Sequence, residues 1–141
     1  SPDKLDDAAK KLLLAVVASL MKALEASPAP DSEWRRLTKV FEPEQLAKLL
    51  DISPASLRRY QSNARETPDE VAARLHYLAL VTADLSGAYN EIGIRRWFQR
   101  KRTLLDGHAP AALLRTGWEP ESAGPTRVRD LARSLTASPA T

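Results

Sequence analysis

Apolar residues recur three and four positions apart along most of the chain, a spacing that predicts amphipathic helices. No segment shows sustained alternation of apolar and polar residues, so the pattern predicts no strand. Ten prolines stand against five glycines, and the prolines fall where helices would begin or linkers would lie. The sequence therefore predicts an all-α fold.

The first predicted helix runs from Asp3 to Glu25 and consists almost entirely of good helix formers. Its acids lie near the start, where the helix dipole favours them. The middle of this helix, residues 12–21, is apolar on every face and would leave apolar surface in water if the helix stood alone. Two partners stay open at this point: a second copy of the chain, or the rest of the same chain. Because this apolar surface calls for a second copy, we expect a homodimer or larger oligomer.

Residues 26–32 hold two prolines among small and polar residues, which predicts a semi-rigid linker. A short helix is predicted to begin at an N-cap, Asp31 or Ser32, and to run through Phe41. Thr67 is predicted to cap a long helix with Pro68 at its first position, ending at about Tyr89. Further helices are predicted over 94–105, 110–115 and 126–135.

These boundaries predict three parts. Residues 1–31 form an N-terminal helix and Pro-rich linker, residues 32–67 a helix-turn-helix domain, and residues 68–141 a small helical C-terminal domain.

Residues 43–62 carry the pattern of a helix-turn-helix. Two helices that cross at about 90–120° need a small residue in the first helix, and Ala47 fits that position. Asp51 stands at the turn, where a left-handed backbone is needed and Asp is tolerated. Ser53 is placed to N-cap the second helix, with Pro54 at its first position. The apolar residues expected to seal the crossing are Leu46, Leu50, Ile52, Leu57 and Tyr60.

The outward face of the second helix is the predicted DNA-binding surface. Small residues near the helix start allow close approach to base edges, and an arginine can bind guanine or clamp a phosphate. Ser53 and Thr67 are candidates for further phosphate contacts. The alternative is an ordinary helical corner with solvated arginines, since the same fold also serves in protein–protein contacts. The predicted DNA-binding residues are Ser53, Ala55, Ser56, Arg58, Arg59 and Ser62.

The segment 94–102 carries five basic residues around Trp97 and Phe98. We expect both aromatic side chains to lie in the core rather than to stack on bases. The basic residues leave two possibilities open. They form a solvated outer face, or they contact phosphates or an acidic patch on a partner.

Composition narrows the function classes. The net charge of +3 is only mildly basic, so nucleic-acid binding depends on where the charge sits. With no Cys, two distant histidines and no Gly-rich phosphate loop, we expect no metal site, no cofactor and no catalytic residue, and hence no enzyme. The longest apolar run is far short of the roughly 20 residues of a membrane span, so we expect no membrane partner. Without the pattern of a secretory signal at its start, the chain is expected in the cytoplasm.

A family resemblance covers residues 43–135. Behind the helix-turn-helix stand Trp97-Phe98, then Leu105, Gly107, Pro110 and Leu113-Leu114, and finally the helix Val128–Leu135. This order resembles the C-terminal toxin-binding domain of the Xre/MbcA/ParS antitoxins, which follows an Xre-like helix-turn-helix.

The resemblance implies an antitoxin of a type II toxin–antitoxin system. Such a protein neutralises a RES-domain toxin, an enzyme that consumes NAD, by covering its active site, and it binds operator DNA to regulate its own promoter. A stand-alone helix-turn-helix transcriptional regulator is the alternative.

The C-terminal arginines flank apolar residues at helical spacing, so part of that helix is expected to face outward toward an acidic partner. The polar tail after it is suited to becoming ordered in a partner's cleft. Removing residues 127–141 is then expected to abolish toxin neutralisation and to leave the helix-turn-helix folded. The alternative is that the arginines are solvated and the helix only completes the core. The predicted toxin-binding residues are Arg127, Arg129, Arg133, Thr136 and Thr141.

Overall fold

The computed structural model describes the backbone of residues 2–137, and the surroundings of the side chains at 6–23 and 27–135. This part of the chain holds seven α-helices and two short 3₁₀ helices and no strand, so the all-α prediction is confirmed. The elements are α1 (Pro2–Ala26), α2 (Pro30–Val40), α3 (Pro43–Leu50), α4 (Pro54–Gln61), α5 (Asp69–Leu85), α6 (Glu91–Trp97), η1 (Thr103–Leu105), η2 (Pro110–Leu113) and α7 (Ala123–Ala137).

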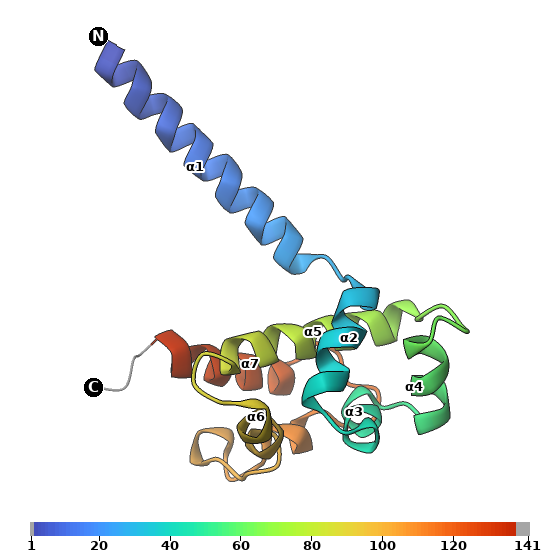
Figure 1. Cartoon of the computed structure of the whole chain (residues 1–141). Coiled ribbons are helices and arrows are strands. Elements are labelled where there is room, and N and C mark those ends of the chain that lie inside the picture. Colours follow the sequence, from blue (N-terminus) through green and yellow to red (C-terminus); the bar gives the residue numbers. More distant parts are fainter. Residues whose placement is uncertain (1, 138–141) are drawn as a thin grey trace.

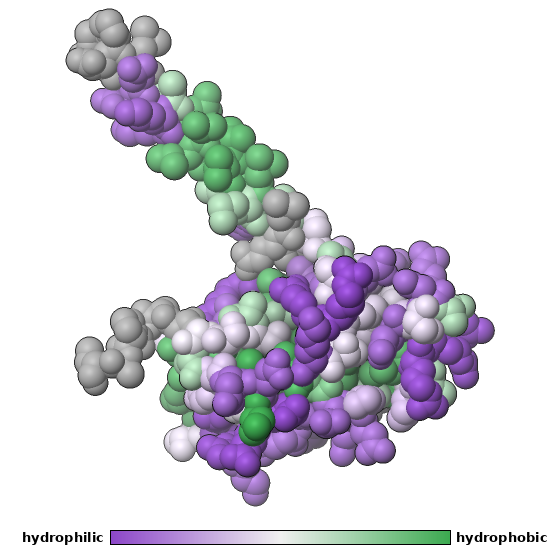
Figure 2. All heavy atoms as spheres, in the orientation of Figure 1, coloured by the Kyte–Doolittle hydropathy of each residue, from purple (hydrophilic) through white to green (hydrophobic). Residues whose placement is uncertain are grey.

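Helix α1 projects away from the rest of the molecule (Figure 1). Its apolar middle does not pack on the helices that follow. Figure 2 shows it as a continuous hydrophobic patch on the projecting arm. The exposed side chains of the patch are Leu12, Leu13, Leu14, Val16, Val17, Leu20 and Met21, with exposed fractions of 41–68%.

None of the helices among the described residues is long and apolar enough to cross a membrane.

The core is built around α5, which packs against α2, α3 and α7. Leu75, Leu78 and Val81 of α5 are completely buried, because their spacing places them on the faces that those helices cover. The buried residues form one cluster that runs from Trp34 in α2 to Ala132 in α7. The two parts predicted at residues 32–67 and 68–141 therefore contribute to one shared core.

Two predicted helix starts are wrong. Helix α2 begins at Pro30 with Ala29 as its N-cap, two or three residues earlier than the predicted caps. The Glu33 carboxylate accepts a 2.8 Å hydrogen bond from the Ala29 N–H, so an acid of the first turn replaces a capping side chain. Helix α5 begins after Pro68, and Thr67 does not cap it. Its Oγ1 instead accepts a 3.0 Å hydrogen bond from the Trp34 indole, because the loop before α5 lies against α2.

The helix predicted over residues 94–105 is also wrong beyond Trp97. Helix α6 ends there, and the chain turns through η1 into a left-handed residue, Asp106, with φ of 55°. The apolar spacing misled because Trp97 and Phe98 both enter the core, after which the backbone reverses. Leu104, within the predicted helix, is 72% exposed. The long helix from residue 69 likewise stops at Leu85, short of Tyr89.

Candidate nucleic-acid interface

Helices α3 and α4 pack against each other through a three-residue turn, as the sequence pattern predicts. Asp51 ends α3 in the left-handed conformation, with φ of 58°. Ser53 then caps α4 by accepting a 3.0 Å hydrogen bond from the Ser56 N–H, and Pro54 takes the first helical position. Ala47 is buried where the helices meet. Leu46, Leu50 and Leu57 are buried around it, and Ile52 and Tyr60 are half-buried.

The outward face of α4 carries the predicted DNA-binding residues. Arg58, Arg59 and Ser62 are exposed, and Ser53 is exposed at the helix start. Ala55 and Ser56 are half-buried, so the small residues lie partly under their neighbours. Neither guanidinium group has a hydrogen bond or an ion pair within the part of the chain that the structure describes. Two arginine head groups are thus available at one face of a capped helix.

Sequence reasoning missed what holds this pair of helices in place. The indole of Trp118 donates a 2.9 Å hydrogen bond to the Leu49 carbonyl, and the Arg74 guanidinium donates to the Leu50 carbonyl at 3.3 Å. The Gly117 N–H donates to the Asp51 carboxylate at 2.9 Å. These donors satisfy groups at the C-terminal end of α3 that have no partner within that helix. The sequence signal that could have indicated these contacts is Trp118, a single aromatic residue in an otherwise polar loop.

The basic run of residues 95–102 divides into two sets. Arg95 donates to the Val40 carbonyl at 3.1 Å, and the Arg102 guanidinium lies 5.2 Å from the centroid of the Trp97 ring. These two side chains fix α6 and the turn after it to the core. Arg96, Arg100 and Lys101 are exposed. The expectation that Trp97 and Phe98 belong to the core is confirmed, since they are 1% and 0% exposed.

The three predicted toxin-binding arginines of α7 differ in their surroundings. Arg127 donates 2.9 Å hydrogen bonds to the Asp106 carboxylate and to the Leu104 carbonyl, which joins α7 to η1. Arg129 is half-buried and Arg133 is exposed. Thr136 lies in the last turn of α7, where side-chain surroundings are not described, and Thr141 lies outside the described residues.

Helix α7 itself belongs to the core. Val128 and Ala132 are completely buried against the rest of the molecule. Removing residues 127–141 would uncover part of the core around α5, which favours the alternative that this helix completes the core.

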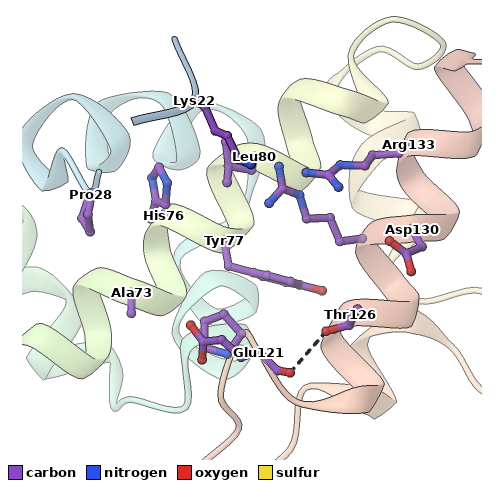
Figure 3. Close-up of a pocket in the computed structure, with 12 residues that line it drawn as sticks. Lys22, Pro28, Ala73, His76, Tyr77, Leu80, Glu121, Thr126, Asp130 and Arg133 are labelled. Carbon is purple, nitrogen blue, oxygen red and sulfur yellow. Dashed lines mark hydrogen bonds between the residues drawn. The ribbon is translucent and has the colours of Figure 1, made fainter. Parts of the chain in front are cut away.

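Arg129 and Arg133 line a cavity of about 500 Å³ between α5 and α7, together with Tyr77 and Asp130 (Figure 3). The Tyr77 hydroxyl donates a 2.7 Å hydrogen bond to the Pro125 carbonyl. Burial raises the pKa of the Tyr77 phenol far above its ordinary value, and the nearby charges of Arg129 and Asp130 have smaller and opposite effects. Tyr77 is therefore a neutral hydrogen-bond donor that joins α5 to the start of α7.

Within the described residues, no three His, Cys, Asp or Glu side chains come together in a way that could hold a metal ion. Comparisons with family models, with curated proteins and with solved structures find no match to this chain.

Proposed function

We propose that this protein binds duplex DNA through α4, in the manner of a helix-turn-helix regulator. The observation that carries the proposal is the exposure of Arg58 and Arg59, without partners in the described chain, on a helix held by a cap at its start. An unpaired guanidinium can bind guanine with two hydrogen bonds or clamp a phosphate. In a helix-turn-helix, the second helix enters the major groove and the first crosses the backbone.

The test of this proposal is Arg58→Ala combined with Arg59→Ala. The probe is a duplex enriched by the parent protein from a random-sequence library. We expect binding to that duplex to weaken by about 1–3 kcal/mol for the arginine that contacts a guanine. Arg35→Ala with Arg36→Ala removes the same charge from exposed positions on α2 and serves as the control. Equal binding by the parent and the α4 variant, or no enriched duplex, would contradict the proposal.

We further propose that the protein is an antitoxin that neutralises a RES-domain toxin and regulates its own operator. The support for this proposal is the family resemblance described above. The residues that carry the resemblance have structural roles in the fold. Trp97, Leu105, Pro110 and Leu114 are all buried, and Gly107 has φ of 82°, which a residue with a side chain rarely adopts. The contact with the toxin would then involve Arg133, which is exposed on α7.

Co-expression with a RES-domain toxin encoded beside the gene tests the antitoxin role. Arg133→Glu should abolish rescue of growth, because it reverses a charge facing an acidic partner. Arg35→Glu reverses a charge on another exposed surface and should leave rescue intact. Full rescue by Arg133→Glu would contradict the α7 contact. Failure of the parent chain to rescue would favour the stand-alone regulator.

We also propose that α1 associates with α1 of a second copy of the chain. The apolar patch of α1 is exposed, and a contiguous exposed apolar patch of this kind marks an interaction site (Figure 2). A second copy also suits the two-fold sites that helix-turn-helix proteins bind.

A further inference from the structure

A basic cleft lies between α3 and α6. It has a volume of about 590 Å³. Its basic residues are Lys48 from α3 and Arg95, Arg96 and Arg100 from α6 and the following turn, against a single acid, Glu44. The remaining lining residues, Gln45 and Gln99, are uncharged hydrogen-bonding side chains. The lining therefore suits an anionic, hydrogen-bonding occupant.

The cleft is held by its own structural contacts. The Gln45 side-chain amide donates a 3.3 Å hydrogen bond to the Arg95 carbonyl, which joins α3 to α6. The Arg95 guanidinium donates to the Val40 carbonyl and lies 3.9 Å from a Glu42 carboxylate oxygen. Arg95 is therefore a positioning residue.

The other three cations of the cleft are available. The head groups of Lys48, Arg96 and Arg100 are exposed and have no hydrogen-bond or ion-pair partner within the described chain. Three unpaired cations at one site repel each other, and an anion that lies among them relieves that repulsion.

A second hollow, which shares two lining residues with the cleft, lies where α4 begins. This hollow is lined by Glu44 and Lys48 again, together with Asp51, Ser53 and Pro54. Lys48 and Glu44 thus face both the cleft and the start of the proposed recognition helix. Because the first helix of a helix-turn-helix crosses the DNA backbone, a strand that passes α3 would run along this surface.

We propose that the cleft between α3 and α6 binds the phosphate backbone of the DNA flanking the site that α4 contacts, through Lys48, Arg96 and Arg100. This inference rests on the proposed DNA-binding function and extends it to a second element, α6. Phosphate contacts of this kind position the protein on the duplex and carry no sequence information. They contribute to all DNA binding, specific or not, and each one makes the affinity more dependent on salt.

The test uses a 30-base-pair duplex of mixed sequence and the variant Arg96→Gln with Arg100→Gln. Affinity is measured by fluorescence anisotropy over a range of salt concentrations. Loss of two phosphate contacts should reduce the slope of log affinity against log salt by about 1.8 and weaken binding about tenfold or more at low salt. Lys10→Gln with Lys11→Gln removes the same charge from α1 and should change neither quantity.

Two further variants separate a local contact from misfolding. Arg96→Lys with Arg100→Lys keeps the charge and should keep the slope, since a phosphate accepts either cation. Glu44→Gln removes the acid of the cleft and should strengthen binding, a gain that damage to the fold would not produce.

The outcomes distinguish the inference from the function on which it rests. If the Arg96/Arg100 variant binds like the parent while Arg58→Ala with Arg59→Ala weakens binding to the enriched duplex, the cleft is not a DNA surface and α4 keeps its role. An equal loss in the α1 control would show a general charge effect and overturn the cleft. If neither the cleft variant nor the α4 variant changes binding, the proposed function and the inference both fall.

Discussion

The indole Nε1 of Trp118 lies 2.9 Å from the carbonyl oxygen of Leu49, and this hydrogen bond joins the loop before α7 to the end of α3. Trp118 is 69 residues further along the chain. Its ring also packs edge-on against Tyr77, with centroids 5.0 Å apart. The orientation of the α3–α4 pair thus depends on the C-terminal third of the protein.

Trp118→Phe should therefore destabilise the fold by about 1–3 kcal/mol, because the Leu49 carbonyl loses its buried partner. Trp118→Ala should cost about 3–5 kcal/mol through the additional loss of packing. Urea unfolding measures both values. Trp97→Phe is the matched control, since the Trp97 Nε1 is buried with no partner in the described chain and its replacement breaks no hydrogen bond. Equal losses for the two Trp→Phe variants would contradict a role for the Leu49 contact.

Two substitutions of Ser53 can distinguish its role as the N-cap of α4 from a role in DNA contact. Ser53→Ala should reduce stability by about 1 kcal/mol, because it removes the acceptor for the Ser56 N–H. Ser53→Asp keeps a good cap and should retain stability, but its negative charge would face the phosphates and weaken DNA binding. Urea unfolding and duplex affinity are measured together.

The control for Ser53→Asp is Asn90→Asp, because Asn90 caps α6 by accepting a 2.8 Å hydrogen bond from the Gly93 N–H. It makes the same charge change beside Tyr89, away from α4. Wild-type affinity in Ser53→Asp would show that the start of α4 does not face DNA.

Two copies of α1 should pair antiparallel. A parallel pair sets Asp7 opposite Asp7, whereas an antiparallel pair can set Asp7 opposite Lys22. That register also sets Leu20 and Met21 opposite the small Ala9 and Ala8. Asp7→Lys should raise the dimer dissociation constant about tenfold, and adding Lys22→Asp should restore it, because the charge pairs are re-formed in reverse.

Analytical ultracentrifugation measures these dissociation constants. No restoration by the second substitution would contradict the register. A monomeric parent at tens of micromolar would contradict self-association through α1.

Tyr77 should make the protein sensitive to alkaline pH. Its pKa is raised by burial in the folded state, while the unfolded chain titrates near 10.0. The contribution of the neutral phenol is therefore complete below pH 10 and is lost as the pH rises toward the folded pKa, at about 1.4 kcal/mol per pH unit. Tyr77→Phe should have a shallower decline in unfolding free energy between pH 10 and 11. Parallel declines for parent and variant would show that Tyr77 is not the group responsible.

The sequence by itself determined the local structure of the α3–α4 pair. Ala47, Asp51, Ser53 and Pro54 act through their immediate neighbours, by size, by tolerance of a left-handed backbone and by capping, so their roles could be predicted without the fold. The long apolar helix α1 was predictable for the same reason, because helix propensity and periodicity act over a few residues.

Only the tertiary structure decided which charged and aromatic side chains are used inside the protein. Arg95 and Arg96 are neighbours with the same local pattern, yet Arg95 binds the Val40 carbonyl 55 residues away and Arg96 remains exposed. Arg127 likewise forms an ion pair with Asp106, and the Trp118 indole donates a hydrogen bond to the Leu49 carbonyl. Such partners are chosen by how distant helices pack, because a hydrogen bond forms only where the fold brings a donor and an acceptor within reach.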